Sequence, residues 1–216
     1  MVGLPAESQP RRPAPYHAGM PATAIALADF DQVMEACGLL VQGVRPEQWE
    51  LPTPCAEWDV RRVVDHLIAG NRMFTAIADG ERPEGAEGFQ QLRARVAPAP
   101  GDDPVATFLE SAQDLREAFG DPDFPEGTYP THAGEQPGEF LIQMRTNEGL
   151  IHGWDLARAT GQTAAFPEAI AEQTLATVHL TLAGRPRDPR GFGAEQPAAA
   201  DAPALDRLAA FLGRSL

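Results

Sequence analysis

A glutamate and a histidine stand four residues apart in the stretch TNEGLIHGWDLARATGQ, residues 146–162. On a helix, Glu148 and His152 would leave the same face, one turn apart. A carboxylate and an imidazole at this spacing can bind one divalent cation and so form half of a metal site. The same pair also occurs on solvated helix surfaces, so the spacing alone leaves both interpretations open.

A third ligand would have to come from another helix, and His66 is the candidate. It occurs in VVDHLIAG, residues 63–70, on a face that the apolar pattern predicts to be buried. Considered alone, His66 is equally consistent with a hydrogen-bonded histidine of the core or its boundary. Glu148, however, is flanked by apolar side chains: Met144, Leu150 and Ile151. Buried carboxylates and imidazoles need partners, and a shared cation would satisfy them together.

The elements that must position these residues are amphipathic helices. Apolar residues recur with helical period in five segments, which we expect to be helices: 24–44, 60–79, 104–120, 140–160 and 167–182. Asp59 and Asp103 stand where N-caps belong, and Gly161 follows the fourth segment as a typical stop. A short amphipathic helix is expected near the end of the chain, so helices dominate the prediction.

The connections between these helices differ greatly in length. Residues 45–58 carry three prolines and two tryptophans and predict an ordered loop, whereas 81–103 predict a long surface connection rich in glycine and proline. Residues 121–139 have turn chemistry that could form a short hairpin. We therefore expect an all-α four-helix bundle with long crossover loops and a short C-terminal extension. Residues 1–20 are expected to be a disordered extension and 21–216 a single domain.

The composition excludes several classes of function. The net charge of −14 disfavours nucleic acid and anionic membranes as partners. All 17 basic residues other than histidine are arginine, so a P-loop lysine and a Schiff base are excluded. The three serines form no G-x-S-x-G elbow. No apolar stretch is long enough to span a membrane, and the expected location is the cytoplasm, where Cys37 and Cys55 would be free thiols.

Two motifs carry a family resemblance. WELPTPCAEWDVRRVVDHLIAGNRMF, residues 49–74, together with TNEGLIHGWDLARATGQ resembles the DinB-like metal-binding superfamily. More closely, it resembles the actinobacterial branch related to the N-terminal domain of mycothiol-dependent maleylpyruvate isomerase. The likeness covers about residues 22–183, and the tail from 191 to 214 resembles the closing segment of small members of that branch. The resemblance implies a DinB-like bundle, in which dimers are common, so a homodimer is possible.

The resemblance also implies a set of metal ligands. His66 matches the family's histidine of the second helix, while Glu148 and His152 match its two ligands one turn apart in a later helix. The metal implied is divalent, usually zinc, although these ligand types also suit nickel and iron. Its remaining positions would be open to water or a thiolate, as in a catalytic zinc site. Asp155, one turn beyond His152, could orient the imidazole or compete as a ligand.

The function implied is thiol-dependent chemistry. A metal that stabilises the thiolate of mycothiol, or of another low-molecular-weight thiol, would support a transferase or isomerase acting on a small electrophile. Too few residues follow the fifth helix for the isomerase's second domain, which weakens the case for maleylpyruvate as the substrate. The alternative is a non-catalytic metal-binding module, such as a sensor or stress protein. A di-iron site is excluded because no histidine has a glutamate three positions before it.

Three further residues are candidates for contact with a substrate or thiol. Arg145, like Arg158, could bind a carboxylate or form a salt bridge on a solvated face. Trp154 could wall the pocket or pack in the core. Cys55 could be a second reactive thiol with its pKa lowered by the following helix, or a small buried hydrophobic residue. Trp58 is expected to hold the preceding loop on the bundle.

Overall fold

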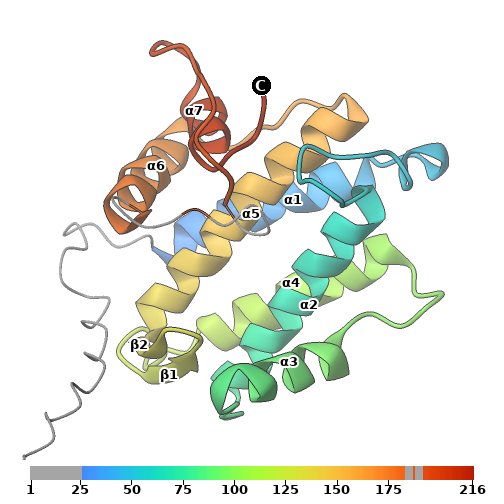
Figure 1. Cartoon of the computed structure of the whole chain (residues 1–216). Coiled ribbons are helices and arrows are strands. Elements are labelled where there is room, and N and C mark those ends of the chain that lie inside the picture. The colour runs from blue at the N-terminus through green and yellow to red at the C-terminus, as the bar shows by residue number, and fades with distance from the viewer. Residues whose placement is uncertain (1–25, 183–186, 188–191) are drawn as a thin grey trace, which may run out of the picture.

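The computed structural model of the chain describes residues 26–182, 187 and 192–216. Within them, four long helices form a bundle: α1 (Leu27–Gln42), α2 (Val60–Ala78), α4 (Pro104–Phe119) and α5 (Gly138–Thr160). Helix α2 packs against α4 and α5, and α1 packs against the same two helices from the other side (Figure 1). The predicted all-α bundle is confirmed. The predicted extension, residues 1–20, lies outside the described residues.

Local sequence fixes the limits of the bundle helices. The Asp59 carboxylate accepts a hydrogen bond from the backbone N–H of Arg62 at 2.7 Å, and Asp103 accepts from the N–H groups of Val105 and Ala106. Both are the N-caps that the sequence predicts. Helix α5 ends at Gly161, which adopts the left-handed conformation with φ of 70°. These caps fix where α2 and α4 begin and where α5 ends.

The core lies between the four helices. Its largest fully buried side chains come from all four of them, among them Phe30, Leu67, Ile68, Ile77, Phe108, Leu115, Phe119, Leu141, Leu150 and Leu156. Helix α1 approaches α5 closely at Gly149, whose carbonyl oxygen accepts a hydrogen bond from Cys37 Sγ at 3.2 Å. A Cβ at Gly149 would lie 2.5 Å from Met34 Cε, so glycine permits this close approach.

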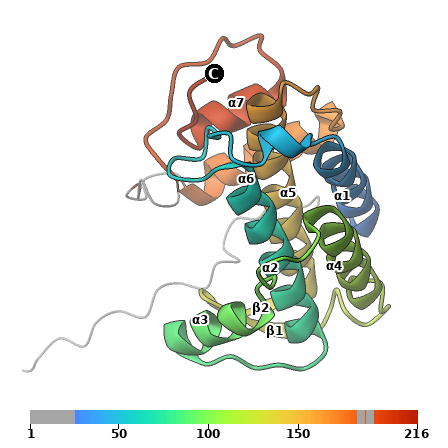
Figure 2. The same cartoon turned by 90° about the vertical axis from the view of Figure 1, so that its right-hand side faces the viewer.

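Two helices and the C-terminal tail cover one flank of the bundle. Helix α6 (Glu168–Leu182) packs chiefly against α7 (Ala204–Phe211), and α7 packs against α5. The loop that precedes α2, including the short helix η1 (Pro46–Gln48), lies near the C-terminal tail (Figure 2). The predicted loop over 45–58 is confirmed, and Pro52 within it forms an isolated antiparallel bridge with Asp59.

No helix among the described residues is long and apolar enough to cross a membrane.

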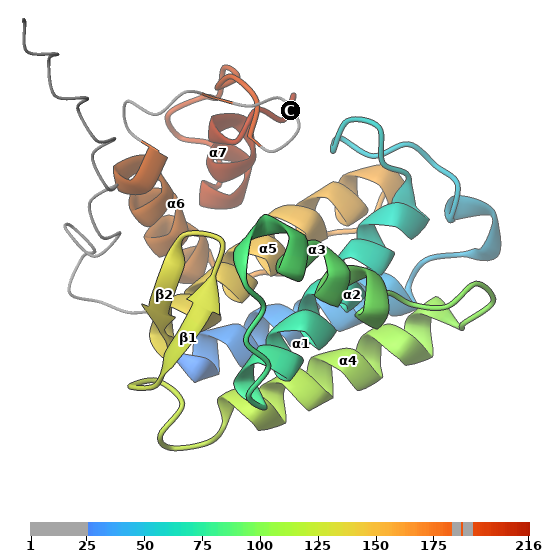
Figure 3. The ribbon, with the colours of Figure 1, turned by 60° about the horizontal axis from the view of Figure 1, so that its bottom comes forward.

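The turn-rich segment before α5 forms the expected hairpin. Strands β1 (Thr128–Thr131) and β2 (Gly134–Pro137) are antiparallel, with Thr131 opposite Gly134 and Thr128 opposite Pro137. The hairpin lies beside α3 and the start of α5 (Figure 3). At this contact, the ring centroids of His132 and Phe89 are 4.1 Å apart.

The prediction of an irregular connection over 81–103 is wrong in part. Residues Gly85–Val96 form helix α3, which packs along α2. Its two glycines, Gly85 and Gly88, weaken its helical propensity, but Phe89 and Leu92 are buried against the bundle. Tertiary packing therefore outweighs propensity in this segment. The correction matters because α3 brings Arg93 to the candidate site.

Candidate metal centre

The bundle brings His66, Glu148 and His152 together. His66 projects from α2, and Glu148 and His152 project one turn apart from α5. His66 Nε2 lies 2.7 Å from Glu148 Oε2, and His152 Nε2 lies 3.5 Å from the same oxygen. The ligand atoms of the three residues all lie within 4.8 Å of one another, so each could contact one ion placed between them.

A buried carboxylate orients His152. Nδ1 of His152 lies 3.1 Å from Oδ2 of Asp155. The Asp155 side chain is fully buried, and that of His152 is 7% exposed. Nδ1–H can therefore donate to Asp155, and when the ring is neutral, Nε2 on the side of Glu148 is the nitrogen without a proton; when the ring is charged, Nε2–H faces Glu148. A carboxylate behind a histidine in this way fixes the tautomer that a metal ligand requires. This geometry agrees with the first of the two roles considered for Asp155.

The C-terminal tail supplies the counter-ion for Asp155. Nη2 of Arg214 lies 3.1 Å from Asp155 Oδ2, and Nε lies 3.3 Å from Oδ1. Both side chains are buried, with side-chain exposures of 7% for Arg214 and 0% for Asp155. A paired arginine offsets the cost of burying this carboxylate. Arg214, Asp155 and His152 thus form one continuous line of contacts that ends at the candidate metal site.

His66 has a different neighbour behind its ring. Nη2 of Arg93, on α3, lies 2.7 Å from His66 Nδ1. Since a guanidinium only donates, Nδ1 accepts this bond, and Nε2 of the neutral ring then carries the proton that is donated to Glu148. A metal at Nε2 would need the other tautomer. The exposed Arg93 side chain must therefore leave Nδ1 before His66 can act as a ligand.

Burial and mutual hydrogen bonding control protonation in the cluster. Burial is the main cause that lowers the pKa of His66 to about 4, so this ring is neutral at physiological pH. Burial opposes the charge of Glu148, but hydrogen bonds from His152 and His66 hold its pKa well below the usual range. Burial also opposes the charge of His152, but Asp155 and Glu148 raise its pKa. The cluster therefore contains an ionised carboxylate and a neutral imidazole, both suited to a cation.

Trp58 is a component of the site whose position we did not predict. Its ring centroid lies 5.6 Å from that of His152 with an interplanar angle of 27°, and 4.7 Å from that of His66. The loop is held there because Thr53 N and Oγ1 both donate to the carbonyl oxygen of Trp58. The indole thus covers both histidines, beyond the stapling role that its place before the Asp59 cap suggested.

A cavity of about 630 Å³ adjoins the three residues, and we call it the site cavity. It is bounded by the loop over residues 54–58, by the ligand side chains, and by the tail around residues 192–196 and 212–214. Cys55 lines it, with Sγ within 4.8 Å of ligand atoms of His152 and Asp155. Burial raises the pKa of the Cys55 thiol to about 11, against the lowering expected from its place before a helix.

The other two candidates for substrate contact lie elsewhere. Arg145 is 2% exposed between α2 and α5, where Nη2 donates to Asn71 Oδ1 at 2.8 Å and to the Leu67 carbonyl at 3.3 Å. Trp154 donates from Nε1 to Asp206 Oδ1 at 2.7 Å. Neither is among the described residues that line the site cavity. Arg145 therefore acts as a buried cation joining two helices, and Trp154 ties α5 to α7.

Comparison with known proteins places this geometry in a family. The sequence model of the mycothiol maleylpyruvate isomerase N-terminal domain matches residues 30–157. The chain belongs to this family. The matched span contains the three ligand candidates, Trp58, Arg93 and Asp155, whereas Arg214 lies beyond it. The resemblance stated from the motifs is thereby confirmed.

Relatives in the family support the same assignment. Two uncharacterised proteins of Mycobacterium tuberculosis, Rv0738 of strain H37Rv and MT0763 of strain CDC 1551, are each 31% identical over 196 residues. Each alignment covers 88% of this chain and 98% of the relative, so the likeness extends beyond the span matched by the family model to nearly the whole of each relative.

Solved structures show the same fold. A mycothiol-dependent maleylpyruvate isomerase superimposes with a TM-score of 0.54 at 19% identity, and a mutant of such an isomerase superimposes with 0.57 at 18%. In both cases the alignment covers 69% of this chain and 66% of the isomerase chain. The bundle fold is shared, while about a third of each isomerase and about a third of this chain lie outside the superposition.

Proposed function

We propose that this protein binds a divalent metal ion, zinc foremost, through His66, Glu148 and His152, and uses it in mycothiol-dependent transfer or isomerisation of a small electrophile. The observation that carries the proposal is the convergence of three ligand atoms beside the site cavity, in a family named for a mycothiol-dependent isomerase. Its place of action is proposed to be the cytoplasm.

The donor set fits a divalent cation. Two imidazole nitrogens and one carboxylate oxygen are the ligands of many catalytic zinc sites, in which a further position stays open. In the absence of a metal, the three groups satisfy one another through the short His66–Glu148 contact and the longer His152–Glu148 contact. A cation between them would replace these contacts while Asp155 keeps His152 oriented. Nickel and iron suit the same ligands.

The residues around the ligands favour a thiol cofactor. A divalent cation bound here would lower the pKa of a thiol and so favour its nucleophilic thiolate form at neutral pH. Trp58 covers the ligand rings on one side, and the tail around Gly193 and Arg214 bounds the cavity on another. These walls would limit access of water to the thiol. The volume of the site cavity leaves room for a small molecule of several rings or sugar units.

The electrophile is proposed only as a class. This chain covers 66% of each solved isomerase, so the activity of those longer proteins is not transferred whole. The bundle and tail supply a metal site and an adjoining cavity, which are the parts that activation of a thiol requires. Addition to an electrophilic carbon, with or without later loss of the thiol, is the reaction that this arrangement supports.

Calorimetry with mycothiol provides the test. We expect mycothiol to bind zinc-loaded protein, and to bind metal-free protein or the His152→Ala variant at least about tenfold more weakly. S-methyl mycothiol is the matched control, because it keeps the sugar units and lacks the ionisable thiol. Equal affinity for the loaded and metal-free forms would remove the thiol–metal contact from the mechanism. Zinc binding without mycothiol binding would favour the non-catalytic module.

A further inference from the structure

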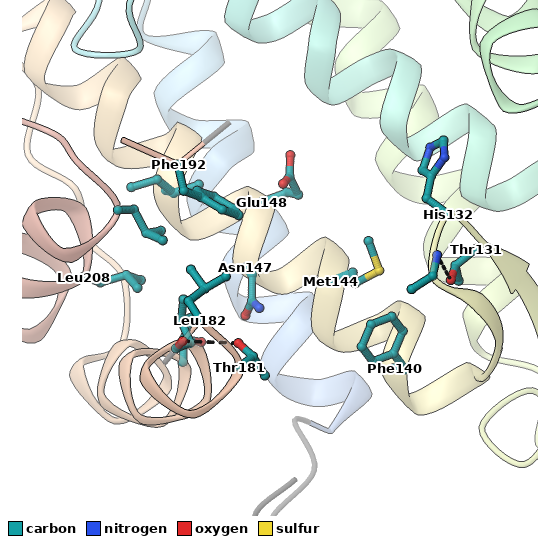
Figure 4. A pocket seen from close by; sticks show the side chains of 15 residues that line it. Thr131, His132, Phe140, Met144, Asn147, Glu148, Thr181, Leu182, Phe192 and Leu208 are labelled. Carbon is teal, nitrogen blue, oxygen red and sulfur yellow. Dashed lines mark hydrogen bonds between the residues drawn. The ribbon is translucent and has the colours of Figure 1, made fainter. Parts of the chain in front are cut away.

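A second cavity lies on the other side of α5 from the candidate metal ligands. It has a volume of about 240 Å³ and is bounded by α5, α6, the tip of the hairpin and the C-terminal tail. We call it the apolar chamber, because most of its wall is hydrocarbon: Phe140, Met144, Ile151, Val178, Leu182, Phe192, Leu208 and Leu212. Figure 4 shows this region, with Phe140 and Met144 on α5 and Leu182 on α6.

The spacing of the lining residues explains why the chamber exists. On α5 they stand at positions 140, 144, 147, 148 and 151, and on α6 at 174, 178, 181 and 182. Both sets follow the three-and-four spacing of a single helix face. Two apolar faces of this kind would ordinarily pack together, but α6 packs chiefly on α7, and α7 on α5. The faces of α5 and α6 are thereby held apart around a space.

One buried polar group in the chamber wall lacks a partner, and a half-buried amide beside it has a donor to spare. Thr174 is fully buried, and its hydroxyl makes no hydrogen bond with any described residue. Other helix threonines, such as Thr146 and Thr177, donate to the carbonyl oxygen four residues earlier. Asn147 accepts from Gln143 through Oδ1, and no acceptor for its Nδ2 is found within the described ranges. A buried polar group without a partner is one that a ligand can satisfy.

The chamber shares a wall with the candidate metal centre. Glu148, Ile151, Phe192 and Leu212 line both the apolar chamber and the site cavity. Figure 4 shows that Asn147 points toward α6, whereas the Glu148 carboxylate points to the opposite side of α5. A molecule in the chamber would therefore lie next to the backbone turn that carries a metal ligand. No arginine is among the described residues that line the chamber.

We propose that the apolar chamber is a binding site for a small, uncharged and largely apolar molecule that carries one hydrogen-bonding group. The apolar wall would bind its hydrocarbon part, and Thr174 and Asn147 would meet the polar group. A carboxylate is disfavoured, because none of the described residues that line the chamber is an arginine that could pair with it. Binding in the chamber does not require the metal. That the bound molecule is the electrophile of the proposed reaction is a further step, which rests on the proposed function.

Binding of 1-naphthol tests this site directly. Fluorescence titration of metal-free protein should show saturable binding of 1-naphthol, with the anion 1-naphthoate binding at least about tenfold more weakly. Metal-loaded protein should bind 1-naphthol as well. Val178→Trp, which fills the chamber from α6, should reduce affinity at least about tenfold. Met144→Trp fills it from α5 and should act in the same way, so the test survives if one variant fails to fold.

The matched control is Leu180→Trp, because Leu180 lies on the same helix but is 59% exposed. This variant should bind 1-naphthol like the wild type. Equal binding by Val178→Trp, Met144→Trp and Leu180→Trp would overturn the proposal, as would tighter binding of the anion. Measuring the zinc content of each variant separates the two proposals. A variant that loses naphthol binding but keeps its zinc supports the chamber as a separate site. Wild-type protein that binds naphthol but no zinc would contradict only the proposed metal site.

Discussion

Arg214 and Asp155 form a buried ion pair that joins the C-terminal tail to the candidate metal site, with Nη2 of the arginine 3.1 Å from Oδ2 of the aspartate. The same oxygen lies 3.1 Å from Nδ1 of His152. The tail lies beyond the span matched by the family model, yet it holds the group that orients a candidate metal ligand. The tail is thus part of the site's framework.

Arg214→Met should therefore destabilise the protein strongly. It leaves the fully buried Asp155 carboxylate without its counter-ion, and loss of one partner of such a pair costs about 3–5 kcal/mol of unfolding free energy. Denaturant unfolding measures this. The double variant Arg214→Met with Asp155→Leu should lose less unfolding free energy than the two single variants lose in sum. Arg45→Gln, which breaks an exposed pair with Glu47, is the control and should leave stability unchanged. Additive losses would show that the two residues act independently.

Arg93→Ala should strengthen metal binding. Arg93 donates to His66 Nδ1 and so favours the tautomer whose Nε2 bears a proton. Removing this exposed donor, together with its positive charge beside the cation, should tighten zinc affinity by roughly 3- to 10-fold. Competition with a chromophoric chelator gives the affinity. Arg95→Ala, on the same helix and paired with Glu81, should have no effect. Weaker binding in Arg93→Ala would instead make Arg93 a supporting residue of the loaded site.

Both cysteines should react slowly with thiol reagents in the folded protein. Burial raises the pKa of Cys37 to about 12 and that of Cys55 to about 11. Because a raised thiol pKa favours the protonated form, the reactive thiolate is scarce at neutral pH and increases as pH approaches these values. Alkylation at pH 7 to 10, with mass spectrometry to separate the sites, should show Cys55 reacting before Cys37. In urea both should react at the rate of an ordinary thiol. Rapid reaction of Cys55 at pH 7 would mark it as an activated nucleophile.

Gly149→Ala should destabilise the contact between α1 and α5. The added Cβ would lie 2.5 Å from Met34 Cε and 2.7 Å from Val33 Cγ1, and the branched Val33 side chain has little freedom to move. Overpacking of this kind costs about 1–3 kcal/mol and outweighs the gain in helical propensity of about 1 kcal/mol. Thermal unfolding of Gly149→Ala measures this loss of stability. Gly38→Ala is the matched control, because its nearest neighbour, Leu109 Cδ2 at 3.2 Å, belongs to an exposed side chain that can move. Equal stability of the two variants would contradict the packing argument.

The bundle and its ligand candidates could be predicted because local signals carry them. Periodic apolar residues and the caps Asp59 and Asp103 define the helices, and the four-residue spacing of Glu148 and His152 is itself a helical property. His66 was selected by its place on a helix face predicted to be buried, and the family resemblance then matched it to a ligand position, although 82 residues separate it from Glu148. The C-terminal counter-ion Arg214 has no local signal at all, because its partner is 59 residues away.

The parts of the site that were missed depend on loops and weak helices. Trp58 lies in a proline-rich loop whose path is set by hydrogen bonds from Thr53, and sequence spacing does not reveal that path. Arg93 reaches the site because Phe89 and Leu92 hold a glycine-containing helix on α2. For Arg145, charge suggested a surface role, whereas Asn71 and the Leu67 carbonyl of α2 accept its hydrogen bonds in the interior. Tertiary contacts decided each of these cases.

Zinc stoichiometry in ligand variants tests the central claim most directly. Purified wild-type protein, dialysed against buffered zinc and analysed by inductively coupled plasma mass spectrometry, should hold one ion per chain. His66→Ala, Glu148→Gln and His152→Ala should each lose most of it, because two remaining ligands bind zinc weakly. His179→Ala removes a histidine that packs on Phe211, away from the three ligands, and should retain the ion. Unchanged zinc content in both His66→Ala and His152→Ala would contradict the account.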